Sequence, residues 1–587
     1  MELNMKSRSH TCGELRISDE NKEVTLIGWV SKKRNLGSLV FVDLRDRFGF
    51  TQIVFEDEKF NSLKNVKSEY VIQVKGLVKK RENPNVKMPT GEIEVVAEEL
   101  TIINNANQTP FIIADDTDAL EDTRLKYRYL DLRRPVMQNY LSTRAKITKS
   151  IRKYLDNLDF LEIETPILTL STPEGARDYL VPSRTRKGSF YALPQSPQLF
   201  KQLLMIGGLE RYYQVARCFR DEDLRADRQP DFTQIDIETS FLDEDEILTL
   251  LENGVKAIWK DVKGIDIETP FRRIPWLEAM SKYGSDKPDT RYGFILQDIK
   301  EELKDIEFEA FKTAECLKCI VIDNVADVTS RKVADSLNEI ARKYSIKQVT
   351  TLKYLNGEIE GSFTKFLTPE MKEKLAIKLN LKENDLIIIA AGSFNHVCFC
   401  LGALRTHYAK KLNLIKPGTF DFLWVIDFPL FEKLDDGTYT SEHHPFTRPR
   451  KEDEALLDIA PEKVLSAAYD IVINGYEAGG GSLRIYDQNM QQKIFNILGF
   501  TDESIQKKFG FFVDAFQYGT PPHGGAAFGL DRLTMILSGT DNIRDVIAFP
   551  KNLNAVCPMS NAPYRVDEQQ LKDLGIEIAQ EYQEKGE

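Results

Sequence analysis

The chain has 587 residues, of which 42% are hydrophobic and 29% are charged, and its formal net charge is −12 at pH 7. Single hydrophobic cores stop growing near about 250–300 residues, so we expect several domains. No apolar run approaches the ~20 residues that span a bilayer, and Met1–Cys12 lacks the apolar segment of a secretory signal. These features argue against a membrane-spanning or small disulfide-stapled protein and predict a soluble, cytoplasmic one.

The seven cysteines are scattered along the chain, which favours a reducing compartment over a disulfide framework. Cys316, Cys319, Cys398 and Cys400 could together supply four thiolates to zinc. We favour buried thiols, because the two pairs lie far apart and Cys398 and Cys400 fall in an apolar alternating run that predicts a strand. Zinc binding by these four residues stays open as the alternative.

Residues 1–106 predict a small β-barrel of the OB type. This segment contains five short runs rich in β-branched and aromatic residues, at 24–30, 39–44, 51–55, 70–76 and 92–96. Five short strands in such a length are typical of the OB fold, which frequently binds single-stranded nucleic acid. The sequence therefore predicts a small barrel of a kind that could bind single-stranded nucleic acid.

The barrel carries side chains suited to RNA contact. Phe41 offers a face for base stacking, and Gln52 offers an amide that can pair with a base edge. Two basic clusters, 32–34 and 79–81, are predicted in loops, where they could meet phosphates or be solvated loop charges.

Residues 107–139 are predicted to be a hinge or linker. From Leu141 to Leu158 the apolar residues have helical spacing, and a strand ending at Pro166 follows. A helix and then a strand that ends at a proline indicate the beginning of a new domain.

Two arginines downstream predict a phosphate site. Arg220 follows a predicted strand, 212–217, and precedes a charged loop and a return strand, so its guanidinium fork is fixed where it could bind a phosphate. Arg532 lies at the start of a predicted helix after a run of small residues, and it adds a cation at the positive end of the helix dipole.

These motifs resemble those of class II aminoacyl-tRNA synthetases. Glu164-Thr165-Pro166, the loop 219–223 and the helix start 529–532 look like motifs 1, 2 and 3 of that class. Segments 171–179, 198–201 and 443–447 resemble the bacterial aspartyl-tRNA synthetases, and the resemblance covers essentially the whole chain. It implies an α/β multidomain (α+β) protein: an N-terminal OB-fold β-barrel, an antiparallel catalytic sheet flanked by helices, and an α/β insertion domain of the GAD type.

The expected segments follow from this resemblance. They are 1–106, an anticodon-binding OB domain; 107–139, the hinge; 140–289, the first part of the catalytic domain; 290–410, the insertion; 411–560, the second catalytic part; and 561–587, a C-terminal extension. The insertion has a helical stretch, Ser330 to Tyr344, and a strand-like run, Asp385 to Ala391, but no catalytic signature. We interpret it as a structural insert that contacts RNA weakly.

The resemblance implies an ATP-dependent, AMP-forming aspartate–tRNA ligase. Such an enzyme converts L-aspartate and ATP to aspartyl-adenylate and pyrophosphate, and then charges tRNA(Asp). We expect a homodimer with Mg²⁺ as cofactor, and neither DNA nor a membrane as partner. The reaction needs no covalent nucleophile, because positioning and charge neutralisation suffice.

The resemblance also assigns residues to the nucleotide and RNA sites. Arg220 and Arg532 would be catalytic, the first on the α-phosphate and the second on the far end of the triphosphate. Asp470 and Glu477 match the magnesium-holding carboxylates, whose hard oxygens suit a metal that also carries phosphates. The expected ATP site comprises Arg220, Asp221, Glu222, Gln229, Glu477, Gly529, Leu530, Asp531 and Arg532, and the anticodon contacts are Phe41, Gln52 and Arg81.

The amino acid pocket is constrained by charge. Aspartate differs from asparagine by one negative charge at nearly equal shape, so discrimination requires buried cations. The resemblance offers Lys201 and Arg484, with Asp236 as a balancing anion. It also implies that Glu174 takes the ammonium group and that His443 lies in a loop over the substrate. The expected aspartate site comprises Glu174, Gln198, Lys201, Arg220, Asp236, His443 and Arg484.

Three alternatives remain at this point. Asparaginyl- and lysyl-tRNA synthetases share the motifs, but the Lys201 and Arg484 pair and the insertion disfavour both. An inactive RNA-binding paralogue would be expected to lose some of the four charged residues at the ATP and metal sites, and the chain keeps all of them. A relaxed enzyme that also charges tRNA(Asn) is the third; Leu36 before Gly37, where relaxed members often carry histidine, favours the strict form.

Overall fold

The computed structural model describes residues 7–56, 59–172 and 175–583, and the chain forms two compact units. One unit comprises Met1–Ser142 with Arg544–Arg565, and the other comprises Thr143–Ile543 with Val566–Glu587. Residues 544–565 therefore pack with the N-terminal unit, although 544–560 were predicted to belong to the second catalytic part. In the described ranges no helix is long and apolar enough to cross a membrane.

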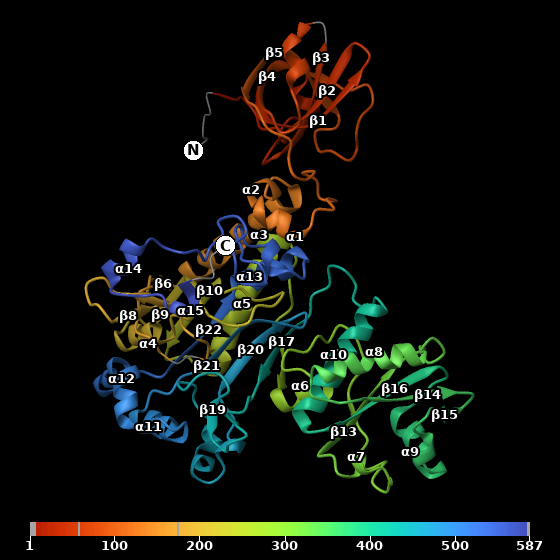
Figure 1. The fold of residues 1–587 in the computed structure, drawn as a ribbon, viewed down its shortest axis with the longest axis vertical. Coiled ribbons are helices and arrows are strands. Elements are labelled where there is room, and N and C mark those ends of the chain that lie inside the picture. Colours follow the sequence, from red (N-terminus) through yellow and green to blue (C-terminus); the bar gives the residue numbers. More distant parts are fainter. Residues whose placement is uncertain (1–6, 57–58, 173–174, 584–587) are drawn as a thin grey trace. The chain divides into compact units, whose positions relative to one another are not determined.

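The N-terminal unit contains a closed five-stranded barrel, as predicted (Figure 1). Its strands pair in the order β1-β2-β3-β5-β4, and the alternating side chains fill the interior. The strands are β1 (Glu23–Leu36), β2 (Leu39–Asp46), β3 (Gly49–Glu56), β4 (Val71–Lys80) and β5 (Ile93–Asn104).

The predicted loop position of the basic clusters is wrong for every member except Arg81, which follows the last residue of β4. Lys32, Lys33 and Arg34 lie within β1, and Lys79 and Lys80 end β4. The β1–β2 hairpin extends to the Leu36–Leu39 pair, so the intervening turn is only Gly37-Ser38. Gly37 has φ +64°, a conformation that glycine adopts without strain. The basic residues therefore stand on the barrel wall.

The predicted hinge contains two short helices, α1 (Glu121–Lys126) and α2 (Arg128–Asp131). Arg128 is buried and donates hydrogen bonds to the carbonyl oxygens of Arg544 (2.7 Å), Ile547 (2.8 Å) and Ala548 (3.0 Å). Asp131 lies 2.6 Å from the same guanidinium and balances its charge. These contacts fasten residues 544–548 to the hinge segment.

The second unit is built on an eight-stranded sheet in the order β11-β17-β20-β21-β22-β10-β9-β6. Neighbouring strands are antiparallel except for the edge pairs β11–β17 and β6–β9. The predicted antiparallel catalytic sheet is confirmed. Its strands are β6 (Leu161–Glu162), β9 (Arg211–Phe219), β10 (Asp231–Ser240), β11 (Arg272–Pro275), β17 (Phe422–Ile426), β20 (Ala468–Ile473), β21 (Tyr476–Leu483) and β22 (His523–Gly529).

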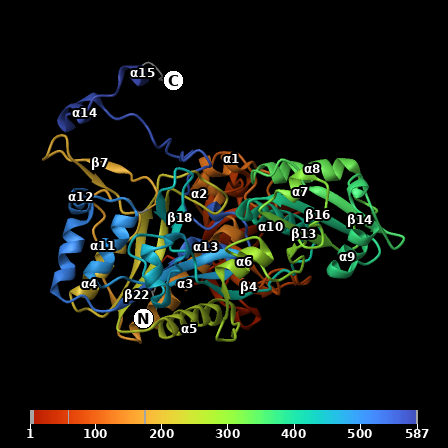
Figure 2. The same cartoon turned by 90° about the horizontal axis from the view of Figure 1, so that it is seen from below.

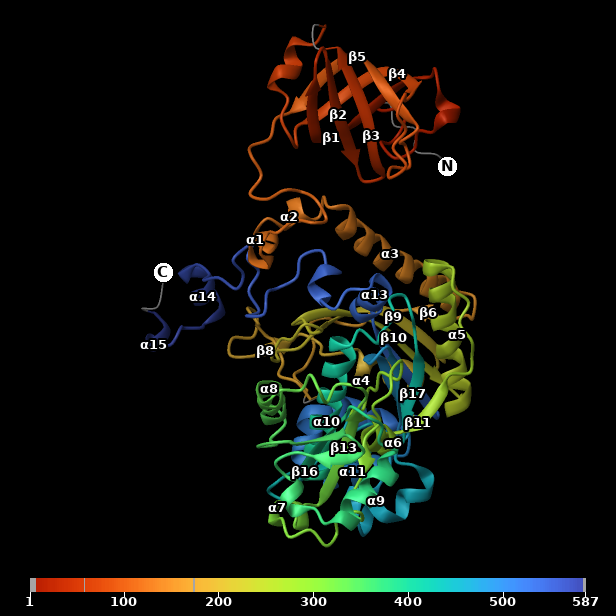
Figure 3. The same ribbon diagram turned by 90° about the vertical axis from the view of Figure 1, so that its right-hand side faces the viewer.

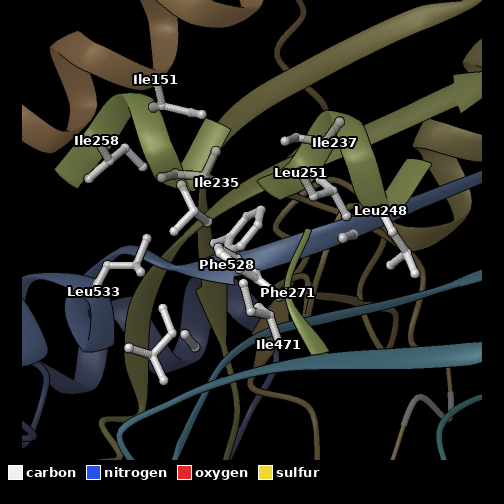
Figure 4. Packing of buried hydrophobic residues seen from close by; sticks show 14 of the residues in the cluster. Ile151, Ile235, Ile237, Leu248, Leu251, Ile258, Phe271, Ile471, Phe528 and Leu533 are labelled. Atoms are coloured by element: carbon white, nitrogen blue, oxygen red, sulfur yellow. The ribbon is translucent and has the colours of Figure 1, made fainter. Parts of the chain in front are cut away.

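Three helices pack on this sheet: α3 (Pro135–Asp156), α5 (Glu244–Lys263) and α13 (Leu530–Ser538). Figure 4 shows Ile151, Ile258 and Leu533 from these helices around the sheet residues Ile235 and Phe528. In Figure 3 α3 and α5 lie side by side. Gly254 of α5 faces Ile151 and Tyr154 of α3, so the absence of a side chain there permits close helix packing.

A second helical group surrounds an aromatic cluster. It comprises α4 (Gln198–Ile206), α11 (Gln488–Ile497) and α12 (Asp502–Val513), which lie together in Figure 2. Phe446, Phe495, Phe509 and Phe512 fill the space between them. The remaining short elements of the unit are β7 (Leu180–Pro182), β8 (Phe190–Ala192), β18 (Phe431–Lys433), β19 (Tyr439–Ser441), α14 (Glu568–Leu574) and α15 (Gln580–Gln583).

The insertion forms its own five-stranded sheet, in the order β12-β13-β16-β14-β15. Helices α8 and α10 pack on one face and α7 and α9 on the other (Figure 1), so β16 is apolar on both faces. The predicted helix and strand are confirmed as α8 and β16. The elements are α6 (Trp276–Tyr283), β12 (Gln297–Asp298), α7 (Glu309–Lys312), β13 (Cys316–Ile322), α8 (Arg331–Arg342), β14 (Thr350–Leu355), β15 (Glu358–Glu360), α9 (Pro369–Leu379), β16 (Asp385–Gly392) and α10 (Phe394–Lys411).

The predicted strand around Cys398 and Cys400 is wrong, because both lie in helix α10. Val397, Leu401, Leu404 and Tyr408 recur there at helical spacing and are buried. Cys316 packs on the same face of the sheet as α10, whereas Cys319 packs on the opposite face. The four thiols therefore do not converge, and the described residues contain no group of three or more histidines, cysteines or carboxylates that could hold a metal.

Candidate active site

A buried charge network lies between α4 and β10. Lys201 on α4 is 2% exposed, and its Nζ lies 2.8 Å from Asp236 Oδ1 and 3.1 Å from Glu238 Oε2. Asp236 and Glu238 are two residues apart on β10, so both carboxylates point to the same face of the sheet. One ammonium group thus holds two carboxylates inside the protein.

Arg484, just after β21, completes this network. Its Nε and Nη2 donate to the two carboxylate oxygens of Glu238 at 2.9 and 3.0 Å, a bidentate arrangement that fixes the guanidinium plane. Its Nη1 donates to Ser482 Oγ at 2.7 Å and lies 2.9 Å from His444 Nε2. Arg484 is therefore held on three sides.

The electrostatics of the network follow from burial and pairing. Burial alone disfavours the charged form of Glu238, but Arg484 and Lys201 outweigh it and lower the pKa of this carboxyl to about 2. Burial raises the pKa of Asp236 against the opposing effect of Lys201. Burial, with Arg484 nearby, holds the pKa of His444 well below its usual value, so the imidazole is neutral. Two cations and two carboxylates then give the network a net charge of zero.

A cavity of about 150 Å³ brings the two predicted arginines together. Arg220 follows β9 and lies over the ring of Phe232 at 5.1 Å, and its buried Nε has no hydrogen-bond partner among the described residues. Arg532 in α13 donates to the carbonyl oxygen of Glu477 at 2.9 Å and lies 3.3 Å from Asp227 Oδ2. Both guanidinium groups line the cavity, so their hydrogen-bond donors face the same space.

The other predicted ATP residues divide into two groups. Glu222, Gln229, Glu477 and Gly529 line the cavity, as does Asp531. The carboxylate of Asp531, however, is bonded to Arg144 and to the backbone N–H of Thr233, so it anchors α13 to α3 and β10. Asp221 lies 3.8 Å from Arg177 and Leu530 is in the hydrophobic core; neither side chain lines this cavity.

The two predicted metal carboxylates lie on adjacent strands. Asp470 is on β20 and Glu477 near the start of β21. Burial and the nearby charge of Glu477 raise the pKa of Asp470, against the opposing effect of His443. His443 Nε2 is 3.9 Å from Asp470 Oδ1. The two carboxylates offer hard oxygen donors, the ligand type that suits a divalent cation.

Gly480 makes room for this carboxylate. A Cβ atom at Gly480 would lie 2.2 Å from Asp470 Oδ1, far inside van der Waals contact. The glycine run 479–481 therefore has a steric role beside the acidic pair.

Of the two remaining residues predicted for the aspartate site, the structure describes Gln198 and does not describe Glu174. Gln198 is the first residue of α4, one turn before Lys201, and its buried Nε2 has no hydrogen-bond partner in the part of the chain that the structure describes. Glu174 lies outside the described residues.

The predicted anticodon residues belong to one polar cluster on the barrel wall. Gln52 donates from Nε2 to Glu94 (2.8 Å), and its Oε1 accepts from Arg81 (2.7 Å) and Arg34 (3.3 Å). Arg81 keeps a buried Nη1 that has no partner among the described residues. Phe41 is half-buried on β2, opposite Arg34 of β1.

Sequence reasoning missed Glu238 and underrated His444. The signal for Glu238 was the spacing of two from Asp236 on a predicted strand, which places both on one face. No sequence signal tells which of the adjacent His443 and His444 reaches Arg484, because that depends on the loop between β19 and β20.

Comparison with known proteins agrees with this geometry. Residues 24–103 match the OB-fold nucleic acid binding domain, and residues 120–553 match the tRNA synthetases class II (D, K and N). An aspartate–tRNA(Asp/Asn) ligase of Geobacillus sp. (strain WCH70) is 52% identical over 590 residues, which cover 98% of this chain and 99% of the relative. An aspartate–tRNA ligase of Streptococcus agalactiae serotype Ia is 51% identical over 577 residues, covering 97% and 99%.

A solved structure shares the fold at much lower identity. The asparaginyl-tRNA synthetase from Pyrococcus horikoshii, complexed with asparaginyl-adenylate, aligns with a TM-score of 0.59 and 20% identity over 93% of this chain and 98% of that one. From the family match, the near full-length relatives and the arrangement of the motifs, the chain belongs to the class II aminoacyl-tRNA synthetases, in the bacterial aspartyl-tRNA synthetase family.

Proposed function

We propose that the chain is an aspartate–tRNA ligase, which forms aspartyl-adenylate and pyrophosphate from L-aspartate and ATP and transfers aspartate to the 3′ end of tRNA(Asp). The observation that carries this proposal is the buried network of Lys201, Asp236, Glu238 and Arg484, which holds two oriented cations in the catalytic unit. The 51–52% identity to aspartate–tRNA ligases over nearly the whole chain supports the same activity.

In this proposal Lys201 and Arg484 bind the side-chain carboxylate of the substrate. Both cations are already held in place by carboxylates at 2.8–3.1 Å, so little reorganisation is needed when aspartate enters. The side-chain amide of asparagine would place its N–H₂ donor against the donors of Lys201 and Arg484, so the binding of asparagine is disfavoured. Glu174 takes the substrate ammonium, Gln198 contacts the amino acid, and His443 closes over it.

The chemistry is an in-line displacement. A carboxylate oxygen of aspartate attacks the α-phosphorus, the P–O bond to the β-phosphate breaks, and pyrophosphate leaves. Arg220 holds the α-phosphate and the attacking carboxylate together, and Arg532 holds the far end of the triphosphate. Asp470 and Glu477 would bind Mg²⁺, which supplies neutralisation of the phosphate charge when bound. In the second step a 3′-terminal hydroxyl of the tRNA attacks the aspartyl carbonyl, and AMP leaves.

The test of amino acid activation is aspartate-dependent exchange of labelled pyrophosphate into ATP by the full chain. We expect exchange with aspartate and at least a hundredfold less with asparagine or lysine. An inactive RNA-binding paralogue, the remaining alternative outside the enzyme class, would give no exchange with any amino acid.

The tRNA range is a separate proposal. We propose strict charging of tRNA(Asp), because the hairpin turn of the barrel carries Leu36, 65% exposed, where relaxed members often carry histidine. The curated relatives include both kinds: the Geobacillus protein is named for tRNA(Asp/Asn) and the Streptococcus protein for aspartate–tRNA alone. Charging of purified tRNA(Asn) tests this point, and rates comparable to those on tRNA(Asp) would favour the relaxed function instead.

We also propose a homodimer formed around motif 1. Apolar side chains about half exposed gather near β6, β7 and β8: Leu161, Ile167, Leu168, Leu170, Leu180 and Phe190. An apolar patch of this kind marks an interaction surface more often than free solvent exposure, and twofold dimers are the commonest closed assembly. Light scattering at micromolar concentration measures the oligomeric state.

A further inference from the structure

A second, larger cavity lies beside the β20–β21 turn, and neither Asp470 nor Glu477 lines it. It has a volume of about 930 Å³ and is lined by α10, by the chain before β17, by the β20–β21 turn and by residues 535–541. Tyr476 lines this cavity whereas its neighbour Glu477 lines the ATP cavity, because adjacent residues of a strand point to opposite faces. None of the predicted site residues lines the larger cavity.

The cavity wall contains a buried arginine with no carboxylate partner. Arg405 on α10 is 2% exposed, and no carboxylate lies within 4.0 Å of it in the described ranges. Its Nε and Nη2 donate to the carbonyl oxygens of Gly293 (2.9 Å) and Tyr292 (2.7 Å). The guanidinium also lies over the rings of Tyr292 (4.1 Å) and Tyr283 (5.2 Å).

One nitrogen of the Arg405 guanidinium, Nη1, is available to donate to a ligand. Nη1 of Arg405 makes no hydrogen bond among the described residues, although Arg405 lines the cavity. Asp289, the acidic residue that lines the cavity nearby, is bonded to Arg291 at 2.7 and 2.9 Å. A buried cation without a counter-ion is costly, and an anion in the cavity would relieve that cost.

Three lysines of the lining add to the positive charge. Lys263, Lys410 and Lys416 are exposed residues of the cavity lining, and none of them forms an ion pair in the part of the chain that the structure describes. The remaining acidic residue of the lining, Asp541, accepts a hydrogen bond from Tyr476 at 3.2 Å. The cavity is therefore a concave surface with an excess of unpaired cations.

We propose that this cavity is a binding site for a small phosphate-bearing anion, separate from the ATP site. Arg405 Nη1 donates to a phosphate oxygen at the bottom, and the lysines, which are strong donors to phosphate, complete the charge balance at the mouth. Phosphate suits these donors better than a carboxylate, because its oxygens can accept from several directions at once.

Equilibrium dialysis of the full chain with radiolabelled inorganic phosphate tests the proposal. The ATP site is first disabled by Arg220→Gln with Arg532→Gln, so that phosphate bound to this chain reports the second cavity. We expect one phosphate per chain. Lys410→Met with Lys416→Met in the same background should weaken binding about tenfold or more, as expected for loss of charge-assisted hydrogen bonds.

Lys411→Met is the matched control, because Lys411 is adjacent to Lys410 on α10 and does not line the cavity; its affinity should equal that of the background. Arg405→Leu should abolish binding, and Arg405→Lys should retain part of it if the variant folds. The variants at Lys410, Lys416 and Lys411 change exposed side chains, so the phosphate affinity that they report does not depend on whether the Arg405 variants fold.

Three results would overturn the proposal: no bound phosphate in the background variant, equal losses from Lys411→Met and the Lys410/Lys416 pair, or displacement of the phosphate by tRNA, which would assign these cations to the RNA backbone. Failure of aspartate-dependent exchange would leave this binding measurement unaffected, so the two proposals fail separately.

Discussion

Replacement of Lys201 by methionine tests the amino acid pocket most directly. Methionine nearly fills the volume of the lysine stem but removes the charge that lies 2.8 Å from Asp236 and 3.1 Å from Glu238. The network then holds one cation and two carboxylates, so its net charge changes from zero to −1 and it repels the substrate carboxylate. Breaking a buried ion pair typically costs about 3–5 kcal/mol, which corresponds to roughly two to four orders of magnitude in kcat/KM.

Asparagine activation should fall much less, because a neutral amide is not repelled. The measurement is the ratio of kcat/KM for aspartate and asparagine in pyrophosphate exchange, for the wild type and the variant. Lys282→Met is a matched control, since Lys282 forms only an exposed pair with Glu278 and such pairs contribute little. If Lys201→Met lowers both amino acids alike, the lysine supports folding or ATP binding, and the pocket assignment is refuted.

The pH dependence gives an independent check. Burial already raises the pKa of Asp236, and loss of Lys201 must raise it further because a stabilising cation has gone. As pH falls, Asp236 in the variant takes up a proton and the network regains neutrality. Aspartate activation by the variant, relative to wild type, should therefore improve from pH 8.5 to pH 6, and a ratio that worsens over this range would contradict the charge argument.

Three other predictions follow from the barrel, the apolar patch and the glycine run. Phe41→Ala should lower tRNA charging by the equivalent of about 1–3 kcal/mol for a lost base stack while pyrophosphate exchange stays near wild type; equal losses in both assays would remove the barrel from tRNA recognition. Leu168→Asp, which puts a charge into the apolar patch, should yield monomers by light scattering, and a variant that remains dimeric would exclude this patch as the interface. Gly480→Ala should displace the Asp470 carboxylate and raise the Mg²⁺ concentration needed for half-maximal exchange, whereas Gly293→Ala, whose Cβ meets nothing within 4 Å, should not; identical Mg²⁺ curves for the two variants would show that the carboxylate is not a metal ligand.

Local patterns predicted most of the strands and helices, because each is set by side-chain periodicity. The barrel, α8 and β16 were predicted this way, whereas the antiparallel sheet was implied by the resemblance to the class II synthetases. The strand predicted at Cys398 and Cys400 was wrong because a short apolar run fits both the helical and the strand periodicity. The packing of α10 against the insertion sheet stabilises the helix. The basic clusters were misplaced because strand length in a barrel depends on pairing with neighbouring strands, β2 for the end of β1 and β5 for the end of β4. A single apolar run does not encode that pairing.

The candidate site was predictable where one residue and its neighbours in sequence define the chemistry, as for Arg220 after its strand. It was less predictable where the chemistry depends on pairing across the fold. The bond between Arg484 and Glu238 joins residues 246 positions apart, and it supplies one of the two carboxylates that balance the charges of Lys201 and Arg484. Charge balance of this kind comes from the assembled sheet.

The contacts of Arg128 constrain the order of events during synthesis. Its hydrogen-bond acceptors are carbonyl oxygens in residues 544–548, which leave the ribosome after residues 143–543, the larger part of the second unit. At about 5–20 residues per second, the roughly 400 intervening residues take some tens of seconds to be made. Throughout that interval the guanidinium of Arg128 lacks the carbonyl oxygens that accept its hydrogen bonds in the folded protein. A nascent chain that stops before residue 544 therefore has an incomplete first unit. A segment synthesised late in translation thus completes the part of the protein that was made first.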